Sequence, residues 1–423
     1  MKKSILSIVC FVMTFSVYSQ KLINLYKKGT IRLIPDTEYA RGNDWNQVFR
    51  SYRDSMMGKD IGARKSLILM PDGSVVVNHA YQNYYTMFSP EGKFVKEFGI
   101  RNAKDQQLKK IQAIEGVINN TFFTEPDNMG YMNCFDFNGK LVKKMRLNYL
   151  ARQMVVLPNQ KIAVVGWVIW KDCFRTFVSI VDYNTNKEHV IWEHRTKQTN
   201  KVTYIQISDP NKQKDNKSIS KPLVTISNPP EIAPPIIAYI GNKLLINLSE
   251  SGDILEYDLS GKFLTKKRAN WAARFLSVEE RKKDSQAQID GIKYGKNQGL
   301  YGDSTDERSR LVHAAIIRLM KENMDRISKP KQIPYFSTVI KDSDGNLLFF
   351  EYPKEENNNI FHVWVFENGG RFVCKSSFVC NDYDLNINPS RMVFHNGYLY
   401  SLQNLKNASG IPMRLVRFRL SAD

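Results

Sequence analysis

Short apolar segments recur along the chain, and tight turns separate them in a fixed order. A strand, a turn, a second strand, a gap and a third strand lead to an aromatic-x-x-x-Gly-Lys turn, as in residues 67–93. In three copies the first and second turns lie nineteen residues apart, at Gly73 and Gly92, Asn120 and Gly139, and Asn242 and Gly261. A fixed period built from β units indicates a stacked or radial all-β architecture.

Six such units can be laid out. Asn-Gly, Asp-Gly and Gly-Gly pairs between the apolar runs are strong hairpin signals, because these residues accept positive φ. The second strand of the units is nearly continuously apolar, as in residues 75–77 and 347–350, which is typical of strands buried on both faces. The pattern therefore predicts an all-β fold, a six-bladed β-propeller with blades at residues 67–102, 110–148, 153–194, 235–271, 336–379 and 391–420.

The ends of the chain complement each other. The sixth unit stops after its third strand, and an isolated strand pattern, TIRLIP, occupies residues 30–35. We expect residues 30–35 to pair with residues 413–420 as the fourth strand of the last blade, because this closes the ring and removes an open sheet edge.

Two inserts interrupt the period. Residues 195–234 are polar and rich in Lys, Asn and Pro, which predicts a loop with a hairpin near residues 202–207. Residues 274–334, between blades four and five, are predicted to be largely helical, because Ser277 and Glu280, and Ser304 and Glu307, have capping-box spacing. A stripe of Leu311, Ala315 and Leu319 predicts that the helix at residues 304–327 packs on the propeller.

The repeat unit resembles a known family. The Asp72-Gly73 turn followed by the Phe88–Lys93 turn is similar to the repeat of NHL and TolB-type propellers. The leader that ends in Tyr18-Ser19-Gln20 is similar to those of exported Bacteroidetes proteins. Together the chain resembles exported six-bladed β-propeller proteins of that group, over the six units but not over the two inserts. The resemblance implies an extracytoplasmic propeller and leaves its activity open.

The N-terminus has the pattern of a targeting segment. Lys2 and Lys3 precede an apolar run at residues 5–17, and small residues follow at the cleavage position. The run is shorter than the roughly 17–25 residues that span a bilayer. We therefore expect a signal peptide at residues 1–19, a mature propeller at residues 20–423 with no transmembrane span, and a location in the periplasm or at the cell surface.

The net charge bears on the class of binding partner, and the cysteine content bears on disulfide pairing. The chain of 423 residues carries a net charge of +19. In an exported protein this charge does not indicate nucleic-acid binding; it favours anionic envelope surfaces or acidic glycans, or serves solubility alone. Four cysteines follow the leader, Cys134, Cys173, Cys374 and Cys380, without CxxC spacing. Free thiols are the preferred interpretation, and disulfide pairing stays open.

Polar residues follow the second strands. The chain has no nucleophile elbow, HExxH, P-loop or GxGxxG motif, so no catalytic or metal-ligating residue is assigned. Positions five to eight residues past each first turn converge on one face of a radial repeat, and oxygens there suit a sugar, a peptide or a cation. The predicted ligand-binding residues are His79, Glu125, Asp127, Asn247, Glu250, Glu351, Tyr352 and Asn404.

Two functions follow from this face. The preferred one is a non-catalytic binding or scaffold module that recognises a cell-envelope peptide, protein or glycan and needs no cofactor. The alternative is a hydrolase or lyase with a metal such as calcium in the central channel, held by Glu125, Glu250 and Glu351. Convergent carboxylates favour the enzyme, whereas apolar and amide side chains in the channel favour the binding module.

Overall fold

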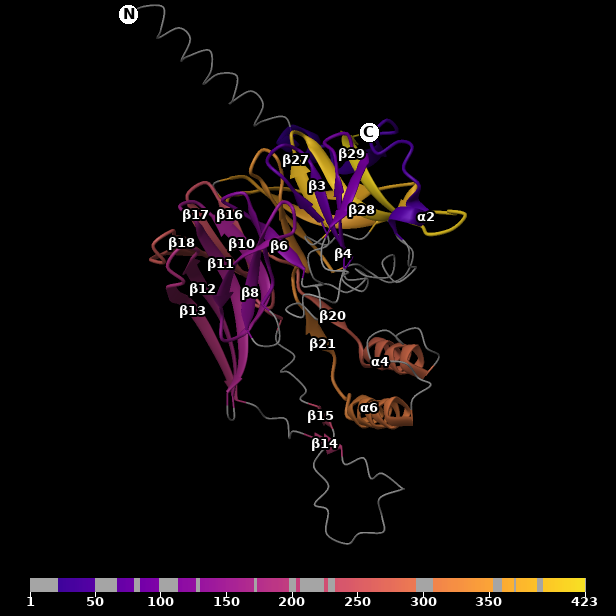
Figure 1. Ribbon diagram of the computed structural model, residues 1–423. Helices are drawn as coiled ribbons and strands as arrows, with labels where there is room; N and C mark the ends of the chain where they lie inside the picture. Colours follow the sequence, from indigo (N-terminus) through magenta and orange to yellow (C-terminus); the bar gives the residue numbers. More distant parts are fainter. Residues whose placement is uncertain are drawn as a thin grey trace, which may run out of the picture.

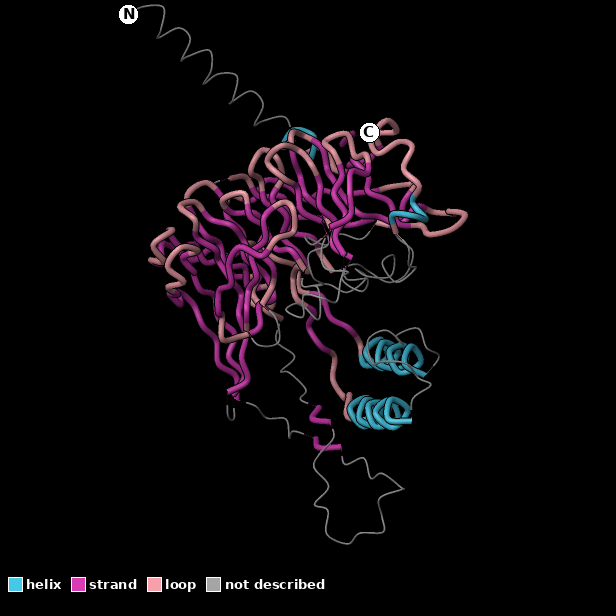
Figure 2. The backbone as a smooth tube through the Cα atoms, in the orientation of Figure 1, coloured by secondary structure: helices cyan, strands magenta, loops and turns pink. Residues whose placement is uncertain are grey.

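The computed structural model of the protein describes residues 22–49, 67–79, 84–98, 113–126, 130–170, 173–197, 203–205, 224–226, 233–293, 307–352, 360–368, 370–385 and 391–422. The predicted leader at residues 1–19 lies outside the described residues. Within these ranges, no helix combines the length and apolar character needed to cross a bilayer. Strands form the body of the molecule, and two helices stand apart from it (Figure 2).

Four antiparallel sheets of four strands follow one another along the chain (Figure 1). The first sheet contains β2 (Leu67–Leu69), β3 (Val75–His79), β4 (Tyr84–Phe88) and β5 (Phe94–Phe98). The second contains β6 (Ile114–Ile118), β7 (Thr121–Thr124), β8 (Tyr131–Asp136) and β9 (Leu141–Arg146). The third contains β10 (Leu150–Leu157), β11 (Lys161–Trp170), β12 (Cys173–Asp182) and β13 (Glu188–Lys197). The fourth contains β16 (Ile236–Ile240), β17 (Lys243–Leu248), β18 (Asp253–Asp258) and β19 (Phe263–Arg268).

A curled sheet of nine strands completes the body and combines both ends of the chain. One part of it consists of β22 (Thr338–Lys341), β23 (Leu347–Phe350), β24 (Ile360–Phe366) and β25 (Phe372–Val379). The other part consists of β1 (Thr30–Pro35), β26 (Tyr383–Asp384), β27 (Met392–His395), β28 (Tyr398–Leu405) and β29 (Met413–Ala422). The five sheets form a propeller-like array.

The first strand of the chain joins the two parts of this sheet. β1 pairs antiparallel with β29, with Leu33 opposite Leu420, as the sequence predicted. It also pairs parallel with β25, with Ile31 opposite Phe378, which the sequence did not predict. β1 therefore has a partner on each side and leaves neither of these strands as an open edge.

The apolar second strands pack between neighbouring sheets. In β11 the four residues 162–165 are fully buried. Ala163 and Val165 pack in one cluster with Leu244 and Ile246 of the fourth sheet, whereas Val164 packs in another cluster with residues of the second sheet. Because both faces of this strand are buried, apolar residues do not alternate with polar ones, and the apolar run is continuous.

The segment after β1 crosses from the nine-stranded sheet to the first sheet. It contains the short helix α2 (Trp45–Val48), whose N-terminus the Asp44 side chain caps. The Asn43 amide donates to Gly92 O at 2.8 Å and accepts from Phe94 N at 3.0 Å. This segment, residues 36–49, thereby ties the two ends of the array together.

Both predicted inserts contain ordered elements. β13 runs to Lys197, three residues into the predicted first insert, and β14 (Thr203–Ile205) pairs with β15 (Val224–Ile226). In the second insert, β20 (Arg274–Leu276) and β21 (Lys331–Ile333) form a two-stranded ribbon. The ribbon leads to α4 (Val278–Lys293) and α6 (Glu307–Asp325), and we call ribbon and helices together the helical arm.

The helical arm begins as predicted but packs differently. Ser277 and Glu280 form the reciprocal capping box, with distances of 2.7 and 3.1 Å. The prediction that the second helix packs on the propeller is wrong, because α6 lies against α4 and both stand away from the sheets (Figure 1). Leu319 is half-buried in this position, and the side chains of Leu311 and Ala315 lie outside the described residues.

Candidate functional site

The array has two chemically different edges. We call the edge with the first-to-second and third-to-fourth strand turns, such as Asp72-Gly73 and Glu91-Gly92, the turn face. The opposite edge carries the second-to-third strand connections, and we call it the insert face. Both inserts extend from the insert face (Figure 1). The described site residues belong to this face, because they lie in or directly after the last residues of β3, β7, β17, β23 and β28.

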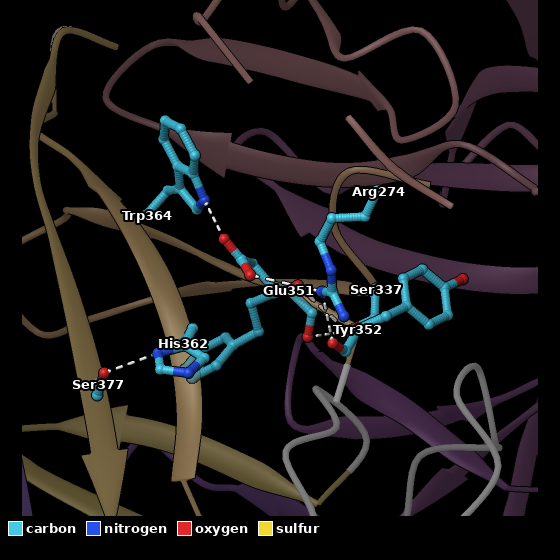
Figure 3. A network of polar contacts seen from close by, with 8 residues as sticks. Arg274, Ser337, Glu351, Tyr352, His362, Trp364 and Ser377 are labelled. Atoms are coloured by element: carbon cyan, nitrogen blue, oxygen red, sulfur yellow. Dashed lines mark hydrogen bonds and ion pairs between the residues drawn. The ribbon is translucent and has the colours of Figure 1, made fainter. Parts of the chain in front are cut away.

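Glu351 lies at the centre of a polar network on the insert face (Figure 3). The indole of Trp364 donates to its Oε1 at 2.7 Å, and Arg274 Nη1 lies 3.5 Å from its Oε2. Arg274 Nη1 also donates to the carbonyl oxygen of Tyr352 at 2.9 Å. Arg274 is the first residue of the helical arm, so this carboxylate helps to fix the base of the arm.

A second carboxylate holds the end of the first insert. Glu250 Oε1 accepts from Ala233 N at 2.9 Å, although the Glu250 side chain is exposed. Burial, and to a smaller extent the charge of Glu250, raises the pKa of the Tyr352 hydroxyl. Tyr352 contacts Arg274 through its carbonyl oxygen.

The connection between β17 and β18 also holds the helical arm. Trp271 Nε1 donates to Gly252 O at 2.8 Å, and Tyr335 N donates to Ser249 O at 2.8 Å. Gly252 has φ of +72°, and a Cβ at this position would lie 2.3 Å from Trp271 Cδ1, so only glycine fits. Residues immediately before and after the helical arm are therefore attached to the same short connection.

Buried amides on this side of the sheets bind neighbouring strands. Asn247 is fully buried, and its Nδ2 donates to Ile236 O at 2.8 Å within the fourth sheet. Asn78 exchanges two hydrogen bonds of 3.2 Å with the backbone of Ile114, which belongs to the next sheet. Such bonds satisfy backbone groups that a strand would otherwise leave unpaired.

The other predicted residues are distributed over the same face. Glu125 is half-buried, and its charge adds to the effect of burial in raising the pKa of Tyr85. Asn404 is half-buried in β28 and lies opposite Met413. The side chain of His79 and the whole of Asp127 lie outside the described residues. Arg274 thus connects Glu351 with the carbonyl of Tyr352, whereas Glu125 and Asn404 belong to other sheets.

Cysteine and metal chemistry can be stated for the described part of the chain. Cys134, Cys173, Cys374 and Cys380 are free thiols, and Cys134 and Cys380 are buried. Among the residues that the structure describes, no group of three His, Cys, Asp or Glu side chains is arranged to hold a metal ion. The carboxylates of Glu250 and Glu351 contact the chain itself.

The sequence did not single out two members of the Glu351 network. Trp364 lies one strand away from Glu351, and Arg274 lies 77 residues before it in the chain. A carboxylate directly after a buried strand was the available signal, but its partners depend on where the insert leaves the sheets and on the pairing of β23 with β24.

Comparison with known proteins gives structural neighbours only. No known protein family and no curated protein sequence matches the chain. Among solved structures, a Bacteroides vulgatus member of the DUF4221 family is 10% identical, with 93% of this chain and 99% of that chain covered and a TM-score of 0.47. An exported protein of Bacteroides fragilis is 9% identical, with coverage of 94% and 96% and a TM-score of 0.45. Virginiamycin B lyase from Staphylococcus aureus is 10% identical, with coverage of 92% and 88% and a TM-score of 0.35.

Proposed function

We propose that the nine-stranded sheet comprises two blades, which makes the protein a six-bladed propeller of the NHL and TolB type. β22 to β25 repeat the consecutive antiparallel order of the other four sheets. β27, β28, β29 and β1 form a second antiparallel set, in which the fourth strand comes from the N-terminus. The parallel pairing of β1 with β25 would then join two neighbouring blades at their outer strands.

Within this fold the protein acts as an exported, non-catalytic binding module, and its partner is a cell-envelope protein or peptide. One observation carries the proposal: carboxylates on the insert face hold the bases of both inserts. Glu351 contacts Arg274, and Glu250 contacts Ala233. Side chains that fix long insertions on a rigid scaffold present those insertions for recognition.

The helical arm offers apolar surface to such a partner. Phe275 in its ribbon is 60% exposed, and Ile316, Leu319 and Met320 of α6 are half-buried in an arm that stands away from the sheets. Amphipathic helices with accessible apolar residues suit a protein groove or peptide better than a sugar. The leader pattern of residues 1–19 supports a location of this interaction outside the cytoplasm.

Excision of the arm helices tests the function. Residues 277–330 are replaced by a Gly-Ser turn that keeps the β20–β21 ribbon, and wild type and variant are screened against immobilised envelope peptides and glycans. We expect peptide binding by the wild type and its loss in the variant, with an unchanged melting transition. Phe275→Ser should weaken the same binding, whereas Phe263→Ser, at an exposed position of β19, serves as the matched control.

Other outcomes of this screen lead elsewhere. Binding that persists after excision but is lost in Glu125→Ala would move the site to the sheet connections. Binding to glycans alone would contradict a protein partner. Hydrolysis that a chelator abolishes and calcium restores would support the metal-dependent enzyme instead.

A further inference from the structure

A cavity opens on the turn face, opposite the inserts. It lies at the seam where the first sheet meets β27 and β28, and its volume is about 500 Å³. This volume lies within the range of roughly 300–1,000 Å³ that is typical of small-ligand sites. Its lining includes three carboxylates and three aromatic or imidazole rings, from Glu38, Asp72, Glu91, Tyr39, Tyr400 and His395. We call this cavity the seam pocket.

Tyr39 lines the seam pocket, and its hydroxyl oxygen is buried beside it. Its side chain is 6% exposed, and its hydroxyl has no hydrogen-bond partner among the described residues. Burial raises the pKa of this hydroxyl well above its usual range, so the group stays protonated. Buried hydroxyls are normally satisfied, and an unsatisfied one beside a cavity therefore indicates a missing partner.

Glycine at position 92 makes room for this tyrosine. Gly92 has φ of +80°, and a Cβ there would lie 2.7 Å from Tyr39 Cζ. The Tyr39 ring packs edge-on against Tyr400, with centroids 5.5 Å apart. The hydroxyl is thus held in place by tight packing at the turn face, and a ligand would meet a preorganised group.

The guanidinium at the pocket is already neutralised. Arg417 also lines the cavity, but its Nε and Nη2 lie 3.0 and 2.6 Å from Asp36 Oδ2. Its guanidinium packs over the rings of Tyr39 and Tyr398 at 4.7 and 4.8 Å. Because Asp36 offsets this charge, the three lining carboxylates give the pocket an acidic character within a chain of net charge +19.

The carboxylates that line the pocket can accept more hydrogen bonds than they do in the structure. Glu91 accepts one bond from Ser89 Oγ at 2.7 Å, and Asp72 accepts from the amide and hydroxyl of Ser74. Glu38 pairs with Arg41 at 3.1 Å, but both side chains are more than 70% exposed, so this pair is easily displaced. Each ionised carboxylate offers about four acceptor positions. A ligand rich in N–H donors would complement this lining.

We propose that the seam pocket binds an organic cation that carries an alkylammonium or guanidinium group. The N–H donors of the cation bond to Glu91 and Glu38, and the Tyr39 hydroxyl oxygen accepts one further N–H. The Tyr400 and His395 rings contact the alkyl part. The group can belong to a free amine or to a Lys or Arg side chain of a peptide, since both present the same chemistry. This site lies on the face opposite the helical arm and is independent of its partner.

Calorimetric titration of the full-length mature protein tests the site. The probes are agmatine, the peptide acetyl-Gly-Arg-Gly-amide, and butylurea as a neutral isostere. We expect saturable binding of at least one cation and none of butylurea. The Tyr39→Phe variant lacks one hydrogen bond to the charged ligand, and we expect it to bind about tenfold more weakly. Glu38→Gln with Glu91→Gln should weaken it more, whereas Glu279→Gln with Glu322→Gln, which removes the same two charges on the helical arm, should leave it unchanged.

Each remaining outcome decides the question. Binding of agmatine identifies a free amine as sufficient, and binding of the peptide alone identifies a side chain in a longer ligand. Failure of both cations overturns the proposal, as does equal binding by Tyr39→Phe or by the double glutamine variant, provided that melting curves show both variants folded. Calcium that binds wild type and displaces agmatine would identify a metal site instead.

Discussion

The insert face and the turn face contain the same types of residue, but these residues have different roles. On the insert face, Arg274 lies against Glu351 and Trp364, and both oxygens of the carboxylate are engaged. On the turn face, Arg417 lies against Asp36 and two tyrosines, but the hydroxyl of Tyr39 next to it has no partner among the described residues. An arginine, a carboxylate and an aromatic ring therefore do not define a ligand site. The proposed ligand site differs by a polar group that lacks a partner among the described residues and lies beside a cavity.

The first prediction concerns removal of β1, the strand that closes the array. Deletion of residues 21–39 removes β1, Asp36 and Tyr39, and thereby leaves β25 and β29 as open edges. We expect loss of the cooperative melting transition, measured by circular dichroism, because the seam core loses its N-terminal side. Excision of the helices on the insert face is the control and should preserve melting. A deletion variant that still melts cooperatively would contradict the closure.

The second prediction uses pH on the turn face. Burial raises the pKa of Asp342 to about 6 from an ordinary value of 3.8, although Tyr26 Oη, Asn346 and the Asp344 amide donate to it. The folded state therefore binds this proton more tightly than the unfolded state. The resulting stabilisation is full below pH 4 and is lost as pH rises through 6, about 3 kcal/mol in all.

Urea unfolding of wild type and Asp342→Asn between pH 4 and 7 measures this effect. The stability difference between the two proteins should shift by about 3 kcal/mol in favour of the variant as pH rises. The pKa of Asp36 is shifted in the opposite direction. Burial raises its pKa, but the hydrogen bonds from Arg417 outweigh this and lower it, so its contribution is lost as pH falls. A pH-independent difference between wild type and Asp342→Asn would contradict the burial argument.

The third prediction compares the two arginines directly. Arg417→Met removes two bonds to Asp36 and the packing over two tyrosines, whereas Arg274→Met removes a longer ion pair and one bond to a carbonyl. We expect losses in unfolding free energy of about 2–3 and about 1 kcal/mol, respectively. Equal losses in urea titrations would show that the packed tyrosines contribute nothing beyond the ion pair.

The smallest expected effect belongs to the helical arm. Burial of Leu319 on the propeller would make Leu319→Asp cost a few kcal/mol, but the side chain is half-buried on an arm that stands apart. We now expect a loss below about 1 kcal/mol in urea unfolding. Val165→Asp, at a fully buried position between two sheets, is the contrasting variant and should unfold the protein. A large loss for Leu319→Asp would restore the original packing prediction.

Local patterns predicted the strands better than their distant contacts. The turn spacing and the apolar runs correctly indicated the hairpins, because φ preferences and burial act within one unit. The pairing of β1 with β29 was predicted from a missing strand, although the observed register reaches Ala422. The parallel contact of β1 with β25 depends on the curvature of the sheet, which no local pattern encodes.

The candidate site was harder to predict for the same reason. Glu351 stood out because it follows a buried strand, but Arg274 is brought to it by the path that the insert takes as it leaves the sheets. Arg417 packs over Tyr39, which lies near the other end of the chain. Its ion-pair partner Asp36 is 381 residues away in the sequence. Contacts at such separation follow from closure of the array, so the seam pocket has no signature in the sequence.

The placement of β1 also sets an order of events during synthesis. This strand is translated well before its antiparallel partner β29, because residues 36–412 lie between the two strands. At about 5–20 residues per second, an unpaired β1 waits on the order of tens of seconds for that partner. The array therefore closes only after translation of β29, and a chain stalled before that point carries an exposed strand that chaperones or neighbouring chains can capture.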